Sequence, residues 1–168
     1  AQLQRQYLSA KQSDELSTQL LKAQIESANM LKSQREETRL AWNSFRDFQV
    51  HGTVNEAKNI TSLYLYPHDR KPLPRFQPGQ SLTLRLILPG DDDPVERNLP
   101  VSSSPSPDFY RITVERNNND PVSHYLHTSV NPHTILKVGA PRGEFCIDTT
   151  LFRPLAMIAE GIGIAPFV

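Results

Sequence analysis

The sequence has little of several residue types, and each shortage excludes a class of protein. Its 168 residues include one cysteine, Cys146, so the chain forms no internal disulfide and offers no cysteine-based zinc or iron–sulfur site. The 18 basic and 18 acidic residues cancel, which gives no charge basis for a nucleic-acid partner. No apolar run approaches the ~20 residues of a membrane span, and no signal-peptide pattern opens the chain. These absences predict a cytoplasmic protein, with any membrane tether placed upstream of residue 1.

Histidine is the remaining metal-binding residue type, and its spacing is also unfavourable. His124 and His127 lie three residues apart, on one face of an expected helix, but no third ligand accompanies them. The acidic run Asp91–Asp93 is typical of a solvated loop. We therefore predict no metal site.

Glycine and proline are absent from the first 45 residues, where Gln, Lys, Glu, Leu and Ala dominate. Such a window favours a long helix, and we predict a helical arm over residues 1–45. An apolar stripe, interrupted at Ser27, follows the helical period at Leu16, Leu20, Ala23 and Met30. Two interpretations remain open. The arm either packs on its own domain or frays in solvent, or it self-associates as a coiled coil or leads back to an upstream segment.

From residue 46 the hydrophobic period changes from helical to alternating. Turn signals separate short segments that predict strands, namely Thr53–Val54, Ile60–Tyr66, Ser81–Leu88, Pro100–Ser102, Tyr110–Glu115, Thr134–Val138 and Glu144–Ile147. Leu82, Leu84, Leu86 and Leu88 are expected on one buried face, and Pro121 is expected to begin a short helix. We predict a mainly β fold over residues 46–152, a six-stranded antiparallel Greek-key barrel with one short helix.

The last residues have a different character. Leu155–Ala159 is a continuous apolar run, which predicts a strand buried on both faces of a parallel sheet. We place a domain boundary at Arg153 and expect residues 153–168 to begin an α/β nucleotide-binding domain. Both chain ends are expected to be cut from a longer protein.

The stretch from Arg97 to Ser104 combines a guanidinium with a run of hydroxyls at a strand end. Those groups suit a phosphate and a polar ring edge. Four other motifs accompany it in order: Phe76–Gln80 (FQPGQ), Val122–Ser123, Ala140–Phe145 (APRGEF) and Gly161–Pro166 (GIGIAP). This succession resembles the ferredoxin reductase-like flavoproteins, and the resemblance extends from Phe48 to Val168.

The resemblance implies FAD, with FMN the less favoured cofactor, and NAD(P)H as substrate. It implies that Arg97 holds the pyrophosphate and that Ser123, at a helix start, adds a second phosphate contact. Ser102 corresponds to the hydroxyl residue near the reacting flavin nitrogen and is the predicted catalytic residue. The complete predicted cofactor-binding set is Arg97, Leu99, Pro100, Val101, Ser102, Val122, Ser123, Gly161, Gly163 and Pro166.

Three positions depart from the family's pattern, because Leu99 stands where Tyr is usual, Pro100 where Ser or Thr is usual, and Ser81 where an aromatic is common. The predicted function is the flavin domain of an NAD(P)H-dependent oxidoreductase that passes electrons to a metal-centre acceptor protein or domain, with iron–sulfur preferred. The fragment alone is not expected to be competent. The alternative is a barrel that has lost its flavin and serves as a docking module.

Overall fold

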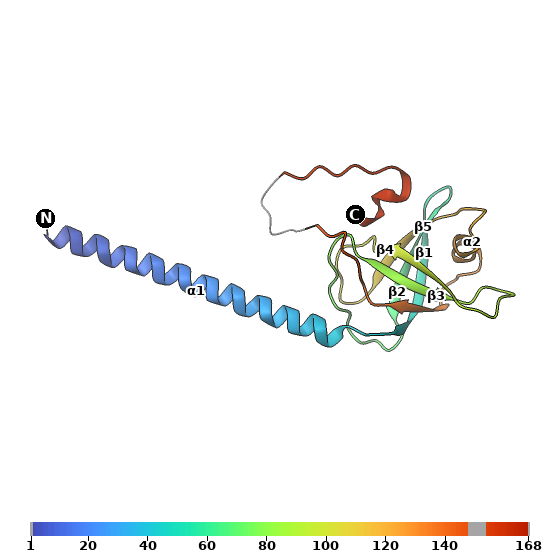
Figure 1. Ribbon diagram of the computed structural model, residues 1–168, viewed down its shortest axis with the longest axis horizontal. Helices are drawn as coiled ribbons and strands as arrows, with labels where there is room; N and C mark the ends of the chain where they lie inside the picture. The colour runs from blue at the N-terminus through green and yellow to red at the C-terminus, as the bar shows by residue number, and fades with distance from the viewer. Residues whose placement is uncertain (1, 148–153, 168) are drawn as a thin grey trace. The chain divides into compact units, whose positions relative to one another are not determined.

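A computed structural model describes residues 2–147 and 154–167 of the chain. The chain divides into two compact units, residues 1–39 and 40–168 (Figure 1). The predicted boundary at residues 152–153 lies outside the described residues. The first unit is a single helix, and the second contains the sheet.

The first unit is helix α1, Gln2–Leu40, which confirms the expected helical segment but ends five residues before residue 45. Six large apolar side chains along it are more than half exposed: Leu16, Leu20, Leu21, Ile25, Met30 and Leu31. Ser27, which interrupts the stripe, donates its hydroxyl to Ala23 O at 2.8 Å. Within residues 2–147 and 154–167, no helix combines the length and the apolar character that crossing a bilayer requires.

The second unit is built on one antiparallel sheet, which confirms the mainly β prediction. Its strands are β1 (Phe45–Ala57), β2 (Ile60–Pro67), β3 (Ser81–Leu86), β4 (Val95–Pro100), β5 (Tyr110–Glu115) and β6 (Ile135–Gly139). They lie in the order β4-β3-β6-β1-β2-β5. A bridge between Val101, just after β4, and Ile112 of β5 joins the two outer strands and closes the barrel.

Strand alternation places the core inside this barrel. Leu82, Leu84, Leu86 and Leu88 are all buried, as the alternating pattern predicted. Phe48 and Tyr110 are fully buried opposite them, with ring centroids 5.9 Å apart. The Tyr110 hydroxyl donates to Pro74 O at 2.9 Å, and this bond ties the proline-rich connection between β2 and β3 to the core.

Strand β1 begins earlier than predicted, at Phe45, because the residues around it have partners across the barrel. Trp42 Nε1 donates to Val138 O at 3.0 Å, and the Trp42 ring lies 5.8 Å from that of Phe48. Phe45 itself pairs with Gly139 at the end of β6. These contacts favour an extended chain where helical propensity alone predicted a continuing arm.

The FQPGQ and APRGEF motifs pack against each other. Ser81 pairs with Arg142 through two backbone hydrogen bonds of 2.8 and 2.9 Å. Gly79 has φ +100°, and a Cβ built there would lie 1.8 Å from Phe145 O. Glycine is needed at residue 79 both for its backbone conformation and for the close approach of this carbonyl.

Two predicted strands are absent, and a third is shifted. Residues 144–147 form no strand, since the pairing of this segment with β3 is limited to the bridge between Arg142 and Ser81. Residues 155–159 form no strand, and Ile158 is 94% exposed, so the predicted strand there is wrong for this chain. A parallel strand requires neighbouring strands, and all described pairings are antiparallel. Strand β4 occupies Val95–Pro100 and not 100–102.

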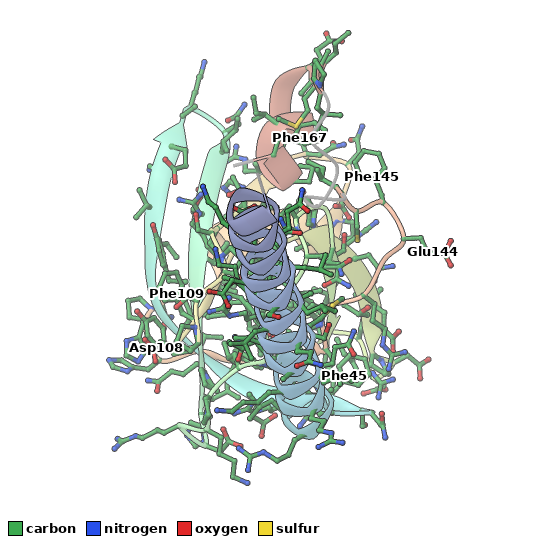
Figure 2. All side chains as sticks on the ribbon, turned by 90° about the vertical axis from the view of Figure 1, so that its left-hand side faces the viewer. Phe45, Asp108, Phe109, Glu144, Phe145 and Phe167 are labelled. Atoms are coloured by element: carbon green, nitrogen blue, oxygen red, sulfur yellow. The ribbon has the colours of Figure 1, made fainter. Side chains whose placement is uncertain are left out.

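The described chain ends in a 3₁₀ helix, η1, Gly161–Phe167. Its last residue, Phe167, lies 6.2 Å from Phe145 between ring centroids (Figure 2). Ala165 of η1 is buried. This end of the chain therefore packs against the APRGEF motif of the same unit.

Candidate functional site

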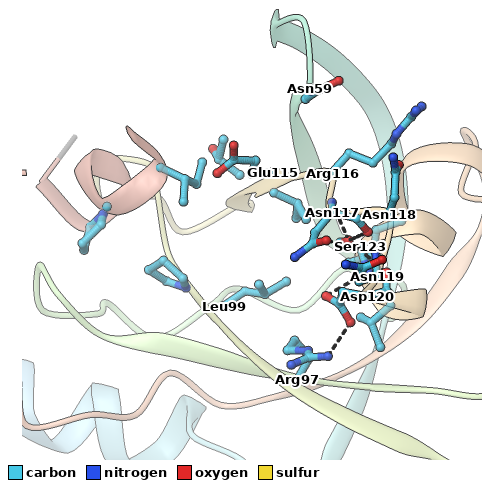
Figure 3. A pocket seen from close by; sticks show the side chains of 18 residues that line it. Asn59, Arg97, Leu99, Glu115, Arg116, Asn117, Asn118, Asn119, Asp120 and Ser123 are labelled. Carbon is cyan, nitrogen blue, oxygen red and sulfur yellow. Dashed lines mark hydrogen bonds and ion pairs between the residues drawn. The ribbon is translucent and has the colours of Figure 1, made fainter. Parts of the chain in front are cut away.

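A cleft of about 910 Å³ opens beside β4 and the start of helix α2, Pro121–Thr128 (Figure 3). Strand β4, the end of β5, the loop 116–120, helix α2 and η1 supply its walls. The lining residues are Asn59, Arg97, Leu99, Pro100, Thr113, Val114, Glu115, Arg116, Asn117, Asn118, Asn119, Asp120, Val122, Ser123, Leu126, Ile162, Gly163 and Pro166. Seven of the ten predicted cofactor-binding residues belong to this set.

Arg97 projects into the cleft from β4. Its backbone pairs with that of Leu84 on β3, and this pairing fixes its place in the strand. Its Nη2 lies 2.6 Å from Asp120 Oδ1, and the two side chains are 45% and 27% exposed (Figure 3). The Arg97 guanidinium is thus held at the start of α2 by an internal carboxylate.

Asp120 also begins α2. It is the N-cap residue, and its Oδ2 accepts from Ser123 N at 3.4 Å. Asp is a favoured N-cap residue because its carboxylate satisfies a helix N–H that has no partner within the helix. Pro121 follows at the first helical position, where its missing N–H costs nothing.

Ser123 lies at the predicted place in the first turn, but its hydroxyl already has protein partners. It is 4% exposed, accepts from Asn117 N at 3.0 Å and lies 3.0 Å from Asp120 O. These bonds shape the loop 116–120. A phosphate contact by this hydroxyl would have to replace them.

Leu99 and Pro100 form an apolar wall of the cleft, and Ile162 and Pro166 of η1 also line it. Leu99 packs in addition against the barrel core. Such a wall can cover a planar ring by apolar contact, although it offers no hydroxyl where the family's pattern has Tyr.

Val101 and Ser102 lie behind this wall. They are 2% and 1% exposed, and neither lines the cleft. The Ser102 hydroxyl is 2.6 Å from Thr113 Oγ1, which is itself 2.8 Å from Ser62 Oγ. Thr113 is the member of this hydroxyl chain that reaches the cleft, and it was not predicted. Its signal in the sequence is its position on β5, between the inward-facing Ile112 and Val114.

Only some of the predicted residues of the GIGIAP motif line the cleft. Gly163 and Pro166 line the cleft, whereas Gly161 begins η1 with φ +54° and is not among the lining residues. The loop residues Asn117 to Asn119 line the cleft as well.

His127, considered above as a metal ligand, links α2 to the barrel. Its Nε2 lies 2.9 Å from Val114 O, and its Nδ1 lies 3.2 Å from Thr61 Oγ1. In the part of the chain that the structure describes, no three His, Cys, Asp or Glu side chains are grouped to hold a metal ion.

Comparison with known proteins finds no matching family model, but it finds clear relatives. The flavohemoprotein of Oceanobacillus iheyensis is 41% identical over 131 residues, which are 76% of this chain and 32% of the relative. The flavohemoprotein of Deinococcus radiodurans is 40% identical over 127 residues, 76% of this chain and 31% of the relative. The chain thus spans about a third of the length of the curated relatives that it matches.

Solved structures agree with this relationship. The flavohem-like FAD/NAD-binding domain of nitric oxide dioxygenase from Vibrio cholerae is 32% identical with a TM-score of 0.70, over 74% of this chain and 54% of that domain. Over 74% of its length the chain is similar in sequence and in fold to this FAD/NAD-binding domain, which supports the resemblance to ferredoxin reductase-like flavoproteins.

Proposed function

We propose that this chain holds FAD in the cleft beside β4 and α2, as the flavin domain of an oxidoreductase that takes hydride from NADH or NADPH. The observation that supports this most is the gathering of seven predicted cofactor-binding residues at one cleft. Its size, about 910 Å³, suits a cofactor of this class, since such sites measure roughly 300–1,000 Å³.

The lining residues fit the parts of a flavin dinucleotide. Arg97 is the residue to hold the pyrophosphate, because its planar guanidinium can contact two oxygens at once. The start of α2 adds a favourable dipole for negative charge. Leu99 and Pro100 would cover the ring and exclude water from it. Thr113 offers a hydroxyl on the cleft surface, with Ser102 behind it to orient that hydroxyl.

Bound FAD would supply the redox chemistry, which is the acceptance of an electron pair with a proton and the release of electrons one at a time. The chain's own contribution is to bind, orient and shield the cofactor. In this assignment Ser102 acts as a positioning residue through Thr113.

For the electron acceptor, a heme group is a better proposal than the iron–sulfur centre preferred from sequence. The curated relatives at 35–41% identity are flavohemoproteins. A ferredoxin reductase-like fold also occurs in phthalate dioxygenase reductase, a [2Fe-2S] system, but at 24% identity this likeness concerns the fold alone. Faster electron transfer from the reduced, FAD-loaded chain to a [2Fe-2S] ferredoxin than to a globin would reject the heme proposal.

The flavin assignment is tested by titrating the purified chain with FAD and following flavin fluorescence and absorbance. We expect saturable binding, and we expect Arg97→Ala to weaken it about ten- to a hundredfold, because a charge-assisted contact to phosphate is lost. Arg85→Ala is the matched control, since Arg85 pairs with Glu96 on the neighbouring strand and does not line the cleft. Equal affinity of Arg97→Ala and wild type would remove Arg97 from the site.

A second candidate is the docking module without flavin. It is favoured by the internal partners of both phosphate-binding candidates, since Arg97 pairs with Asp120 and the Ser123 hydroxyl bonds to the loop. A colourless protein whose properties do not change on adding FAD would support this candidate over the first.

A further inference from the structure

Asp120 occupies the place where an anionic ligand of Arg97 would lie. Its carboxylate is 2.6 Å from Arg97 Nη2, and both groups line the cleft (Figure 3). A carboxylate oxygen at this distance accepts a charge-assisted hydrogen bond from the guanidinium, as a phosphate oxygen of a ligand would. The protein thus carries an internal competitor for the cofactor's phosphate.

The charges around the cleft strengthen this competition. Its lining contains two cations, Arg97 and Arg116, and two carboxylates, Glu115 and Asp120. Their formal sum is zero, so the surroundings of the cleft offer no net attraction to a pyrophosphate. Removing the charge of Asp120 would make that sum positive and would release Arg97 at the same time.

The second role of Asp120 makes this a position that can be tested cleanly. As the N-cap of α2, Asp120 accepts from Ser123 N. Asn and Ser are N-cap residues of comparable quality, so Asp120→Asn and Asp120→Ser keep the helix start while removing the charge. The effect of the carboxylate on ligand binding can therefore be separated from its effect on folding.

We propose that Asp120 is a specificity-determining residue of the flavin cleft. Its carboxylate pairs with Arg97 until a phosphate group of the ligand takes its place. The affinity for a flavin therefore depends on whether that flavin carries phosphate. This inference rests on the proposed flavin function. It assigns to Asp120 a positioning role through Arg97. Flavins without phosphate are unaffected by the exchange of partners, because they do not compete for the guanidinium.

The experiment compares the wild-type chain, Asp120→Asn and Asp120→Ser in titrations with FAD, FMN and riboflavin. We expect both variants to bind FAD and FMN about tenfold more tightly. Loss of the partly exposed ion pair and loss of the repulsion between the Asp120 carboxylate and phosphate should each raise the affinity by up to about a factor of five. Riboflavin affinity should stay the same. In the Arg97→Ala background, Asp120→Asn should give a clearly smaller gain, because only the repulsion between the Asp120 carboxylate and phosphate is then removed.

Glu96→Gln is the matched control. Glu96 lies on β4 next to Arg97 and forms an exposed ion pair with Arg85, but it does not line the cleft. It neutralises one carboxylate on the same strand and should leave all three flavin affinities unchanged.

Three results would overturn the proposal: FAD binding by Asp120→Asn that is equal to or weaker than wild type, an equal gain for riboflavin, or a gain that is as large without Arg97 as with it. If no variant binds any flavin, the proposed function fails, and inorganic pyrophosphate then decides the inference by calorimetry. Tighter pyrophosphate binding by Asp120→Asn than by wild type supports the competition, and equal binding rejects it.

Discussion

Gly79 shows how much one residue can carry at the contact between two motifs. Its φ of +100° is a conformation that side chains with a Cβ rarely adopt. The carbonyl of Phe145 lies where that Cβ would be. The glycine of the FQPGQ motif is therefore required by Phe145 of the APRGEF motif, 66 residues later, in addition to its role in a local turn.

Gly79→Ala should lower the free energy of unfolding by about 3 kcal/mol, because it combines backbone strain with a clash against a backbone oxygen. Gly90→Ala is the matched control, since Gly90 has φ +92° but nothing within 4 Å of the built Cβ. It carries the strain alone and should cost about 1 kcal/mol. Urea unfolding of both variants measures the difference. Equal losses in the free energy of unfolding would show that the backbone at Phe145 moves aside at no energetic cost.

Individual site residues were predictable only where a motif marked them. Arg97 and Ser123 follow from the order of the family's motifs, and the structure places both at the cleft. Asp120 and Thr113 were missed because their importance depends on contacts across the fold. The pairing of Arg97 with Asp120 spans 23 residues, and nothing in the loop 116–120 distinguishes that carboxylate from a solvated one.

At the scale of elements, alternation and turn signals identified the strands that pair with at least one neighbouring strand. β2, β3, β5 and β6 were predicted within a few residues. The segments 144–147 and 155–159 have apolar patterns that also favour strands, yet neither is paired. A strand exists by its hydrogen-bonded neighbours, and a sequence window does not contain them. The boundaries of α1 and β1 depended likewise on contacts of Trp42 and Phe45 with β6.

Helix α1 presents a stripe of apolar side chains at Leu16, Leu20 and Met30, each more than half exposed. A long helix gains most of its stability from packing an apolar face, so we expect α1 to self-associate. Ser27 lies within the stripe and bonds only along its own helix in the structure described, to Ala23 O. Ser27→Leu would complete the apolar seam and should strengthen association about tenfold.

Sedimentation of the full chain, of Ser27→Leu and of a chain lacking residues 1–39 measures this association. Asn29→Leu is the control, because residue 29 lies away from the stripe on the helical period. The shortened chain should be monomeric. Monomers in every case would reject self-association and leave the interpretation of an arm that does not pair with its own copy.

At the scale of the whole molecule, the barrel is closed around one core. Val101 and Ile112 join the outer strands, and Tyr110 ties the connection between β2 and β3 to the interior. One continuous core predicts one cooperative unfolding transition for residues 40–168. A group buried at its centre should then affect the stability of the whole unit.

Tyr110 is such a group. Burial raises the pKa of its phenol well above the ordinary value of 10.0, although nearby Arg46 acts in the opposite direction. The folded protein keeps this proton at a pH where the unfolded chain has lost it. Its contribution to stability is therefore complete below pH 10.0 and declines as the pH rises above that value.

We expect the free energy of unfolding to fall above pH ~10 by up to about 1.4 kcal/mol per pH unit from this group alone. Tyr110→Phe should remove that dependence while costing about 1 kcal/mol at neutral pH, because Pro74 O loses its donor. Urea unfolding of both proteins at pH ~8 and ~11 gives the difference, in which the titration of other groups cancels. Parallel pH profiles for wild type and Tyr110→Phe would show that the phenol ionises as readily in the folded barrel as in the unfolded chain.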